Sequence, residues 1–388
     1  MELEKRLKDL DVVMVSHIFA TGAFLDLEEF LKTKVNALLF IGHPFSFRKE
    51  VNSFYRFYSQ EKLIKTHRAF PWRLPEIFMY IKDFLYTFKW VLFWPNKFDY
   101  YFAADNYDGF LGLIFKKIGK VENVVFYTID YVPNRFKNPL LNRLYHYFDA
   151  QCLKHCKIVW NISPNMVAAR EKYNKLRREK CVSQIVVPQG IWYNRIPKPP
   201  LAKRNRYRIV FLGHLVERQG LDLVIRALPK IIKKIPKVSL LIIGTGSFEK
   251  NLKNIVRERK LNKYVTFTGY IEKDTDIERK IAESGIAVAM YKPTSDNLTY
   301  FADPGKIKNY LSAGLPIVLT DVPPIARDVQ EKKCAFIAKY EEEDFSEKVI
   351  CLLDDKKRLK EYSKNAIEYA SRFDWNIIYL EALEKTIH

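Results

Sequence analysis

The sequence predicts an α/β protein built from two doubly wound, Rossmann-like domains. Its 388 residues are enough for two domains of ordinary size. Short apolar strands alternate with helical patterns through both halves, which is typical of parallel sheets covered by helices. A stretch at 193–206 holds three prolines among basic residues and has no apolar period, so we expect it to link the two series. The sequence thus predicts domains at 1–196 and 203–371 that face a cleft, and a last segment at 372–388.

The first domain begins with an apolar strand at 11–16, which is followed by a loop at 16–22 and a helix at 25–32. Further strands are expected at 36–41, 98–103, 123–128, 157–162 and 183–187, and further helices at 139–157 and 164–173. Ligands of such sheets bind beyond the carboxyl ends of the strands, so side chains that follow a strand are candidates for function.

The second domain is predicted from a helix stop signal. Residues 304–314 read as a helix that ends at Gly314, with Pro316 just after it and an apolar strand at 317–320. The other strands are expected at 207–212, 238–244, 264–268 and 287–291, and the other helices at 221–235 and 248–259. An amphipathic helix at 373–386, centred on Trp375, closes the chain.

Glycine-containing loops follow the strands of the second domain. The first is the run 211–222, Phe-Leu-Gly-His-Leu-Val-Glu-Arg-Gln-Gly-Leu-Asp, in which Gly213 lets the backbone approach a diphosphate and Gly220 serves the turn into a helix. Gly244 and Gly246 follow the next strand, and Pro304, Gly305 and Lys306 open the helix that ends at Gly314. A plain strand-to-helix turn is the alternative for any one of these loops, but their order and spacing favour a nucleotide site.

This series resembles the C-terminal domain of GT-B fold glycosyltransferases of the retaining family 4 type (glycosyl transferases group 1). The resemblance covers about 185–380 well and the first domain more loosely. It implies a nucleotide diphosphate-sugar as donor substrate, with no other cofactor and no metal, and a C-terminal helix that crosses back to the first domain. The donor would lie among Gly22, Gly213, His214, Arg218, Gln219, Gly244, Gly246, Asp303, Pro304, Gly305, Lys306 and Asn309.

The sequence departs from the family pattern at three of these positions. The family usually has Arg after the first glycine, Lys before the glycine at Gly220, and Glu where Asn309 stands; here the first two are His214 and Gln219. Arg218 and Lys306 are the candidates to supply the missing cations and to stabilise the leaving diphosphate. Asp303 is the nearest carboxylate for the donor sugar.

In the first domain, His17, His43 and Asp130 follow or end strands. His17 and Asp130 are the candidate catalytic residues toward the acceptor, since a carboxylate at a strand end can act as an acceptor ligand or base. The alternatives are a packed core histidine at position 17 and an Asx turn before Pro133 at position 130. Gly22 suits a close backbone approach to the donor.

The run from Trp72 to Trp94 is dense in aromatic residues and follows several basic ones, and the net charge of the chain is +20. Such a run is either a core helix or a helix that attaches to an anionic membrane surface, as Trp and Tyr favour membrane interfaces. Nucleic-acid binding is disfavoured because no recognition module is present. We also expect no transmembrane span, no signal peptide and no metal site.

We therefore expect a glycosyltransferase that moves a hexose to a lipid-linked or polysaccharide acceptor, on the cytoplasmic, inner face of the cell membrane. Five scattered cysteines fit a reducing compartment. A non-catalytic GT-B scaffold that binds sugar or lipid and a GT-B-fold sugar-nucleotide epimerase are the alternatives. A nicotinamide oxidoreductase is disfavoured because no Gly-x-Gly-x-x-Gly follows the first strand of either domain.

Overall fold

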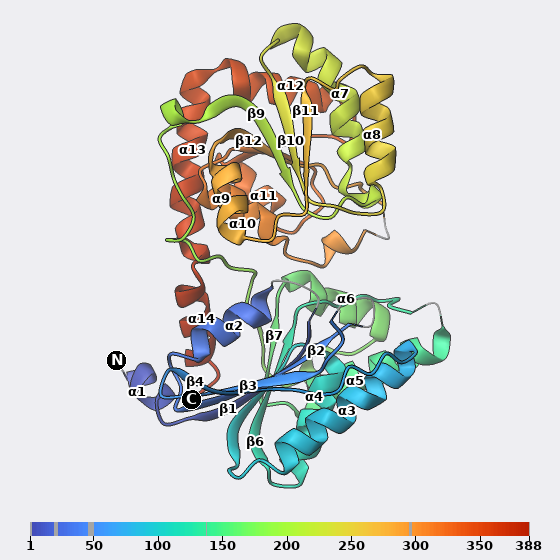
Figure 1. Cartoon of the computed structure of the whole chain (residues 1–388), viewed down its shortest axis with the longest axis vertical. Helices are drawn as coiled ribbons and strands as arrows, with labels where there is room; N and C mark the ends of the chain where they lie inside the picture. Colours follow the sequence, from blue (N-terminus) through green and yellow to red (C-terminus); the bar gives the residue numbers. More distant parts are fainter. Residues whose placement is uncertain (1, 19–21, 46–49, 137, 295–296, 388) are drawn as a thin grey trace. The chain divides into compact units, whose positions relative to one another are not determined.

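A computed structural model describes residues 2–18, 22–45, 50–136, 138–294 and 297–387 of the chain. Contacts divide the chain into two compact units (Figure 1). The first unit holds Met1–Pro188 and Asn376–His388, and the second holds Gln189–Trp375. Residues 189–196, predicted for the first domain, thus belong to the second unit, where Ile191 forms a β-bridge with Asp374.

The sheet of the first unit has eight strands in the order β4-β3-β2-β1-β5-β6-β7-β8. They are β1 (Asp11–Ile18), β2 (Ala37–Pro44), β3 (Phe54–Ser59), β4 (Lys62–Arg68), β5 (Phe98–Ala103), β6 (Val121–Thr128), β7 (Ile158–Asn161) and β8 (Gln184–Val186). From β2 through β8 in this order the pairs are parallel, as predicted. The chain runs from β1 outward to β2, and then returns to lay β5 on the other side of β1, so the topological switch point lies between β1 and β5.

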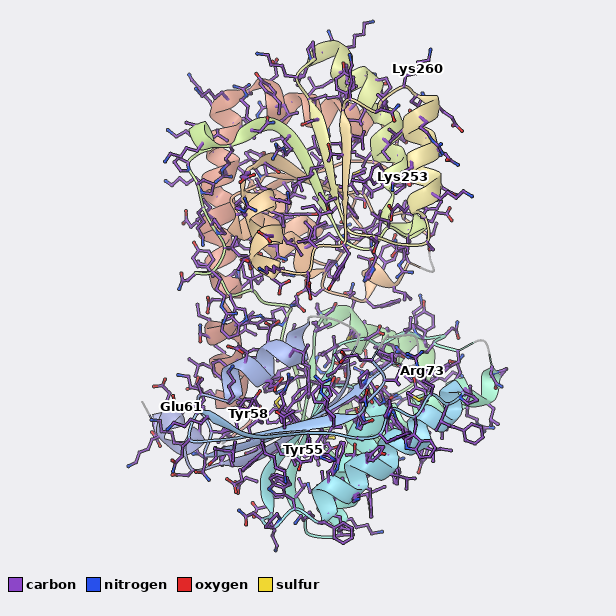
Figure 2. The ribbon with its side chains drawn as sticks, in the orientation of Figure 1. Tyr55, Tyr58, Glu61, Arg73, Lys253 and Lys260 are labelled. Carbon is purple, nitrogen blue, oxygen red and sulfur yellow. The ribbon has the colours of Figure 1, made fainter. Side chains whose placement is uncertain are left out.

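An antiparallel hairpin of β3 and β4 extends this sheet at the edge next to β2, and the sequence analysis did not predict it. Gln60 and Glu61 form its turn with φ angles of 48° and 66°. Figure 2 labels Glu61 at this turn and Tyr55 and Tyr58 on β3. Such two-residue turns usually carry Asn or Gly, so the sequence gives no ordinary turn signal here.

The helices of the first unit include α2 (Ala23–Leu31), α3 (Glu76–Leu92), α4 (Asn106–Lys117), α5 (Pro139–His155) and α6 (Pro164–Asn174). In Figure 1, α3, α4 and α5 cover one face of the sheet. Val13 of β1, Trp90 of α3 and Phe115 of α4 are buried in the core between them. The aromatic run of α3 is therefore partly core, with Trp90 on its inner side.

The second unit contains a six-stranded parallel sheet in the order β11-β10-β9-β12-β13-β14. Its strands are β9 (Asn205–Leu212), β10 (Ser239–Ile243), β11 (Val265–Gly269), β12 (Ser284–Ala289), β13 (Ile317–Leu319) and β14 (Ala335–Ile337). Its α-helices are α7 (Leu221–Lys234), α8 (Glu249–Glu258), α9 (Asp274–Ala282), α10 (Gly305–Ser312), α11 (Ala326–Glu331), α12 (Glu342–Asp354) and α13 (Lys356–Ala370). The switch point of this sheet lies between β9 and β12, so ligand-binding residues are expected beyond the ends of those strands.

The last helix, α14 (Trp375–Glu384), returns to the first unit, which confirms the predicted fold class in this respect. Tyr379 is fully buried and its hydroxyl donates to the carbonyl of Ala23 at the start of α2. Near the end of the chain, the indole of Trp160 donates to Thr386 Oγ1 over 3.0 Å. The chain terminus is thus part of the first unit's core.

Candidate functional site

The loops that follow β9 and β10 pack closely at the switch point of the second sheet. Gly213 has φ +140°, and Gly244 has φ +130° with its backbone so close to Gly213 that an added Cβ would lie 2.1 Å from the Gly213 oxygen. Gly246 lies equally tight against Leu215. These glycines permit two backbone loops to touch, which a side chain would prevent. The structure thus brings together three of the five glycines predicted for the donor site.

Lys306, in the first turn of α10, places its ammonium beside the same loop. Its Nζ lies 2.6 Å from Gln219 Oε1, and 4.2 Å and 5.3 Å from the ring centroids of Phe211 and Tyr291. A Cβ on Gly213 would lie 2.8 Å from this Nζ. Although Lys306 as a whole is half-buried, its ammonium is enclosed by these groups, and this burial lowers its pKa to about 7. A cation with little solvation is thus held beside an exposed backbone loop.

Asp303 is occupied by protein groups in this structure. Its Oδ2 accepts from the backbone N–H of Gln189 over 2.9 Å, and its Oδ1 pairs with the buried ammonium of Lys308. Pro304 caps α10 and Gly305 lies against Gln189. The carboxylate predicted to meet the donor sugar therefore fixes the start of α10 in the structure as it stands.

The remaining donor candidates of the second unit vary in exposure. His214 and Arg218 are exposed, and the backbone oxygen of Arg218 accepts from Lys292 N over 3.0 Å. Asn309 is half-buried on α10, one helical turn from Lys306. Of the two predicted cations, Lys306 has its ammonium enclosed beside the glycine loops, whereas Arg218 is exposed, so the two cations are not equivalent.

In the first unit, His17 at the end of β1 lies in a cluster of buried charges. Its Nδ1 is 2.8 Å from Asp105 Oδ2 and 3.3 Å from Asp108 Oδ2, and its Nε2 is 3.6 Å from Asp83 Oδ2. Burial opposes the charging of His17, but the negative charges of Asp108 and Asp105 outweigh it and raise its pKa well above the ordinary value. His17 is thus packed in the interior, with its side chain 6% exposed, but against carboxylates and not apolar groups alone.

The carboxylates of this cluster respond to the same charges. Burial opposes the ionisation of Asp105, but the charge of His17 outweighs it and lowers the pKa of Asp105 to about 2. Burial and the charge of Asp105 raise the pKa of Asp108 to about 7. Among the described residues, His17, Asp105 and Asp108 are also the group whose ligand atoms lie close enough together to hold a metal ion. Distances of 2.8 Å and 3.3 Å match an imidazolium hydrogen-bonded to carboxylates.

Asp83, Asp105 and Asp108 were not among the residues predicted from the sequence. Asp105 directly follows the apolar run that ends at Ala104, and it caps α4 by accepting from Asp108 N over 2.9 Å. A carboxylate between a strand and a helix is thus the signal that would have found it. No local signal marks Asp83, because it lies in the middle of α3.

His43, Asp130 and Gly22 have different surroundings. His43 is fully buried, with Nε2 2.7 Å from Thr87 Oγ1 and Nδ1 3.2 Å from Asp83 Oδ1. Asp130 follows β6 and pairs with Arg135 at 2.7 Å, and its side chain is 61% exposed. Gly22 starts α2 in an extended conformation with φ 172°, and a Cβ there would meet nothing within 4 Å, so the described residues leave room around it.

Comparison with known proteins gives the site a family context. Residues 193–369 match the family model described as "Glycosyl transferases group 1". A relative in Mycobacterium tuberculosis, named "GDP-mannose-dependent alpha-(1-6)-phosphatidylinositol monomannoside mannosyltransferase", is 32% identical over 97 residues, which are 23% of this chain and 25% of the relative. The "Phosphatidyl-myo-inositol mannosyltransferase" of Mycolicibacterium smegmatis is 22% identical over 231 residues, or 58% of this chain and 56% of that protein. The alignments thus span from about a quarter to little over half of these curated relatives.

Solved structures match nearly the whole chain. Anabaena Alr3699/HepE in complex with UDP has a TM-score of 0.65 at 16% identity and covers 97% of this chain and 99% of that one. The sucrose-phosphate synthase of Thermosynechococcus elongatus has a TM-score of 0.72 at 13% identity, with coverages of 96% and 97%. At such identities the likeness establishes the fold. Residues 193–369 thus match the glycosyl transferases group 1 family, and the chain has the predicted GT-B fold.

Proposed function

We propose that this chain is a glycosyltransferase that moves a hexose from a nucleotide diphosphate-sugar to a lipid-linked or polysaccharide acceptor. The observation that carries the proposal is the ammonium of Lys306 beside the closely packed backbone of Gly213, in the domain that matches this family. Backbone loops without side chains admit a diphosphate, and a nearby cation binds its negative charge. Relatives named for GDP-mannose and complexes with UDP support a donor of this class.

The chemistry that follows is electrostatic. As the bond between the anomeric carbon and the diphosphate oxygen breaks, its electron pair leaves with the diphosphate. The acceptor oxygen bonds to the same carbon, and the proton of the acceptor hydroxyl passes to the departing diphosphate oxygen. Lys306 stabilises the charge that develops, in surroundings that hold little water. Arg218 would add a second, more exposed cation. Retention of configuration and independence of metal are implied by the family resemblance.

We further propose that the chain works at an anionic membrane surface, as a peripheral protein on the inner face of the cell membrane. The outer side of α3 supports this, because Phe78, Ile81 and Leu85 are 56%, 50% and 60% exposed at helical spacing. Arg73, just before α3, and Lys89 within it are exposed cations (Figure 2 labels Arg73). Apolar and basic side chains together match the interface of an anionic membrane.

The outer side of α3 lacks one of the aromatic residues of the run that was expected to attach to a membrane. Trp90 is buried against Tyr55 and Tyr86, so it contributes to the core rather than to an outer surface. No helix among the described residues is long and apolar enough to cross a membrane. The names of two relatives include phosphatidylinositol lipids as part of their substrates, which supports a lipid-linked acceptor here.

A thermal-shift panel of UDP, GDP and ADP with their sugars tests the donor site. A ligand that binds only the folded chain raises its melting temperature, so one base should do so and the others should not. Release of the nucleoside diphosphate from the matching sugar nucleotide then tests transfer. Stabilisation without release would favour the non-catalytic scaffold, and interconversion of the sugar without release would favour the epimerase. No stabilisation by any nucleotide would overturn the proposal.

A further inference from the structure

Ionisable side chains end three neighbouring strands of the first sheet. His43 lies on β2 and His17 on β1, where the two residues are register partners, and Asp105 follows β5. β1 and β5 are the strands that flank the topological switch point. In open α/β sheets a ligand binds beyond the carboxyl ends of strands at this point. His17 and Asp105 thus meet, 2.8 Å apart, where the topology of the first unit places a ligand.

The cluster around His17 consists of His17, Asp83, Asp105 and Asp108, and only Asp105 among these four is well exposed. The side chains of His17, Asp83 and Asp108 are 6%, 2% and 2% exposed, whereas that of Asp105 is 36% exposed. Burying several ionisable groups together is costly, and such groups are concentrated at functional sites. Asp105 is therefore the group of the cluster that a ligand in solvent can reach, and the other three lie behind it.

The buried carboxylate of Asp83 is held in place by several neighbouring side chains. It accepts from Ser53 Oγ over 2.8 Å, and its carboxylate lies 3.0 Å from Lys82 Nζ and 3.2 Å from His43 Nδ1. These contacts fix the carboxylate on α3. Asp83 Oδ2 lies 3.6 Å from Nε2 of His17, beyond hydrogen-bond distance, whereas Asp105 Oδ2 lies 2.8 Å from Nδ1. The two carboxylates thus face opposite nitrogens of the imidazole, and the charge of Asp83 favours the ring orientation in which Nδ1 contacts Asp105.

Aromatic side chains surround the imidazole. The rings of Tyr80 and Tyr107 lie 5.4 Å and 6.3 Å from that of His17, and the Tyr107 hydroxyl donates to the carbonyl of Tyr80. Both tyrosines are half-buried. A half-exposed carboxylate beside partly exposed aromatic rings suits a polyhydroxylated ring, whose hydroxyl groups donate to the carboxylate and whose apolar face packs on an aromatic ring.

We propose that Asp105 binds a hydroxyl group of the acceptor, a polyhydroxylated ring, and that Asp83, acting through His17, is a positioning residue for this carboxylate. The inference rests on the proposed function and assigns its acceptor side. It differs from the sequence-based choice of Asp130, which is bound by Arg135 in a more exposed position. Asp276 on α9, whose carboxylate lies 3.0 Å from Arg279 Nη2 and is 43% exposed, is the matched control for Asp105.

The first experiment measures nucleoside diphosphate release by the full chain, with the donor identified by thermal shift and octyl α-mannoside or octyl β-glucoside as acceptor probe. Asp105→Asn should lower acceptor-dependent release about 10- to 100-fold, as expected when a charged hydrogen-bond partner is lost, and should keep the thermal shift by the nucleotide. Asp276→Asn should behave as the wild type. An Asp105→Asn variant with the wild-type rate, or equal losses in the two variants, would overturn the inference while the proposed function stands.

The second experiment tests the site and its positioning without turnover. In spectra of the ¹⁵N-histidine-labelled chain, the His17 ring should be an imidazolium at neutral pH, and the octyl glycoside probe should shift its signals. Asp83→Asn should lower the pH at which His17 loses its proton and raise KM for the probe more than it lowers kcat, whereas Asp83→Glu should restore part of both. If no donor is turned over, the proposed function fails, but the His17 signals still test the acceptor site. His17 signals that do not shift on addition of the probe would overturn the acceptor site.

Discussion

The ammonium of Lys306 lies 2.6 Å from the amide oxygen of Gln219, although the two residues are 87 positions apart. Gln219 stands where the resembling family usually has Lys, so its neutral side chain supplies no charge there. Lys306 brings a cation to the same place from α10, and the amide oxygen of Gln219 holds it. We therefore expect Lys306 to offset the departure from the family pattern at Gln219.

Lys306→Met should therefore separate stability from activity. Loss of the cation should lower kcat/KM for nucleotide release. The decrease should correspond to roughly 2–4 kcal/mol of lost transition-state stabilisation. The melting temperature should rise, because an enclosed ammonium is removed. Lys253→Met, on α8 at an exposed pair with Glu249, is the matched control and should change neither quantity (Figure 2). Arg218→Ala should also lower activity, but less, since charges in solvent are screened. Wild-type activity of Lys306→Met would contradict this role.

The binding of the nucleoside diphosphate should depend on pH through Lys306. In the protein without ligand, burial lowers the pKa of Lys306 to about 7. The negative charge of a bound diphosphate would raise this pKa again. Above pH 7 the complex then holds more protons than the free protein, so affinity should fall with rising pH, by at most about tenfold per pH unit for one proton. Calorimetry in two buffers of different ionisation heat measures the proton uptake. The same uptake in Lys306→Met would exclude Lys306 as its source.

Gly213→Ala should impair the donor site while Gly22→Ala should leave the fold intact. At Gly213 the φ of +140° strains any side chain, and the new Cβ would meet the Lys306 ammonium. This substitution should cost about 1–3 kcal/mol of stability and weaken nucleotide binding. At Gly22, where φ is extended and the Cβ meets nothing within 4 Å, the melting temperature should not change. If Gly22→Ala still weakens nucleotide binding, the predicted close approach of Gly22 to the donor is supported; unchanged binding would remove Gly22 from the site.

The sequence predicted most of the parallel strands, though not the short β14, and the glycine loops, because these depend on local patterns. Apolar runs such as 98–103 became strands with the predicted bounds, and Gly213, Gly244 and Gly246 lie together as their spacing indicated. The hairpin of β3 and β4 was missed, because its turn uses Gln60 and Glu61 in a conformation that usually requires Asn or Gly.

The charged cluster was missed for a different reason. Asp83 and Asp105 come from a helix and from a strand end that only the folded sheet brings to His17. In the sequence, Asp83 was a polar interruption of an aromatic run, and nothing near it indicated a partner. The same limit applies to Trp90, because composition does not tell which side of a helix faces the core.

Removal of the chain from Phe373 onward should destabilise the protein and abolish activity. This truncation deletes α14, whose Tyr379 is fully buried against α2, and Thr386, which accepts from the indole of Trp160. Tyr379→Phe should cost about 1 kcal/mol for one hydrogen bond, and Tyr379→Ala about 3–5 kcal/mol for the lost core volume. Urea unfolding of the three variants measures these differences. A truncated chain with wild-type stability would show that α14 is dispensable for the first unit.

The membrane proposal predicts sedimentation of the full chain with anionic vesicles at low salt and little sedimentation with zwitterionic ones. Each Lys or Arg near an anionic surface contributes on the order of 1 kcal/mol, and salt screens this attraction, so binding should weaken as salt is raised. Replacement of Phe78, Ile81 and Leu85 by Ser should reduce binding further, because each of these apolar side chains of α3 is at least half exposed. Tyr270→Ser in the second unit, at a residue 76% exposed, is the control and should bind like the wild type. If the triple variant sediments as the wild type does, α3 is not the contact surface. If the wild type itself stays in solution, a soluble acceptor is favoured over a lipid-linked one.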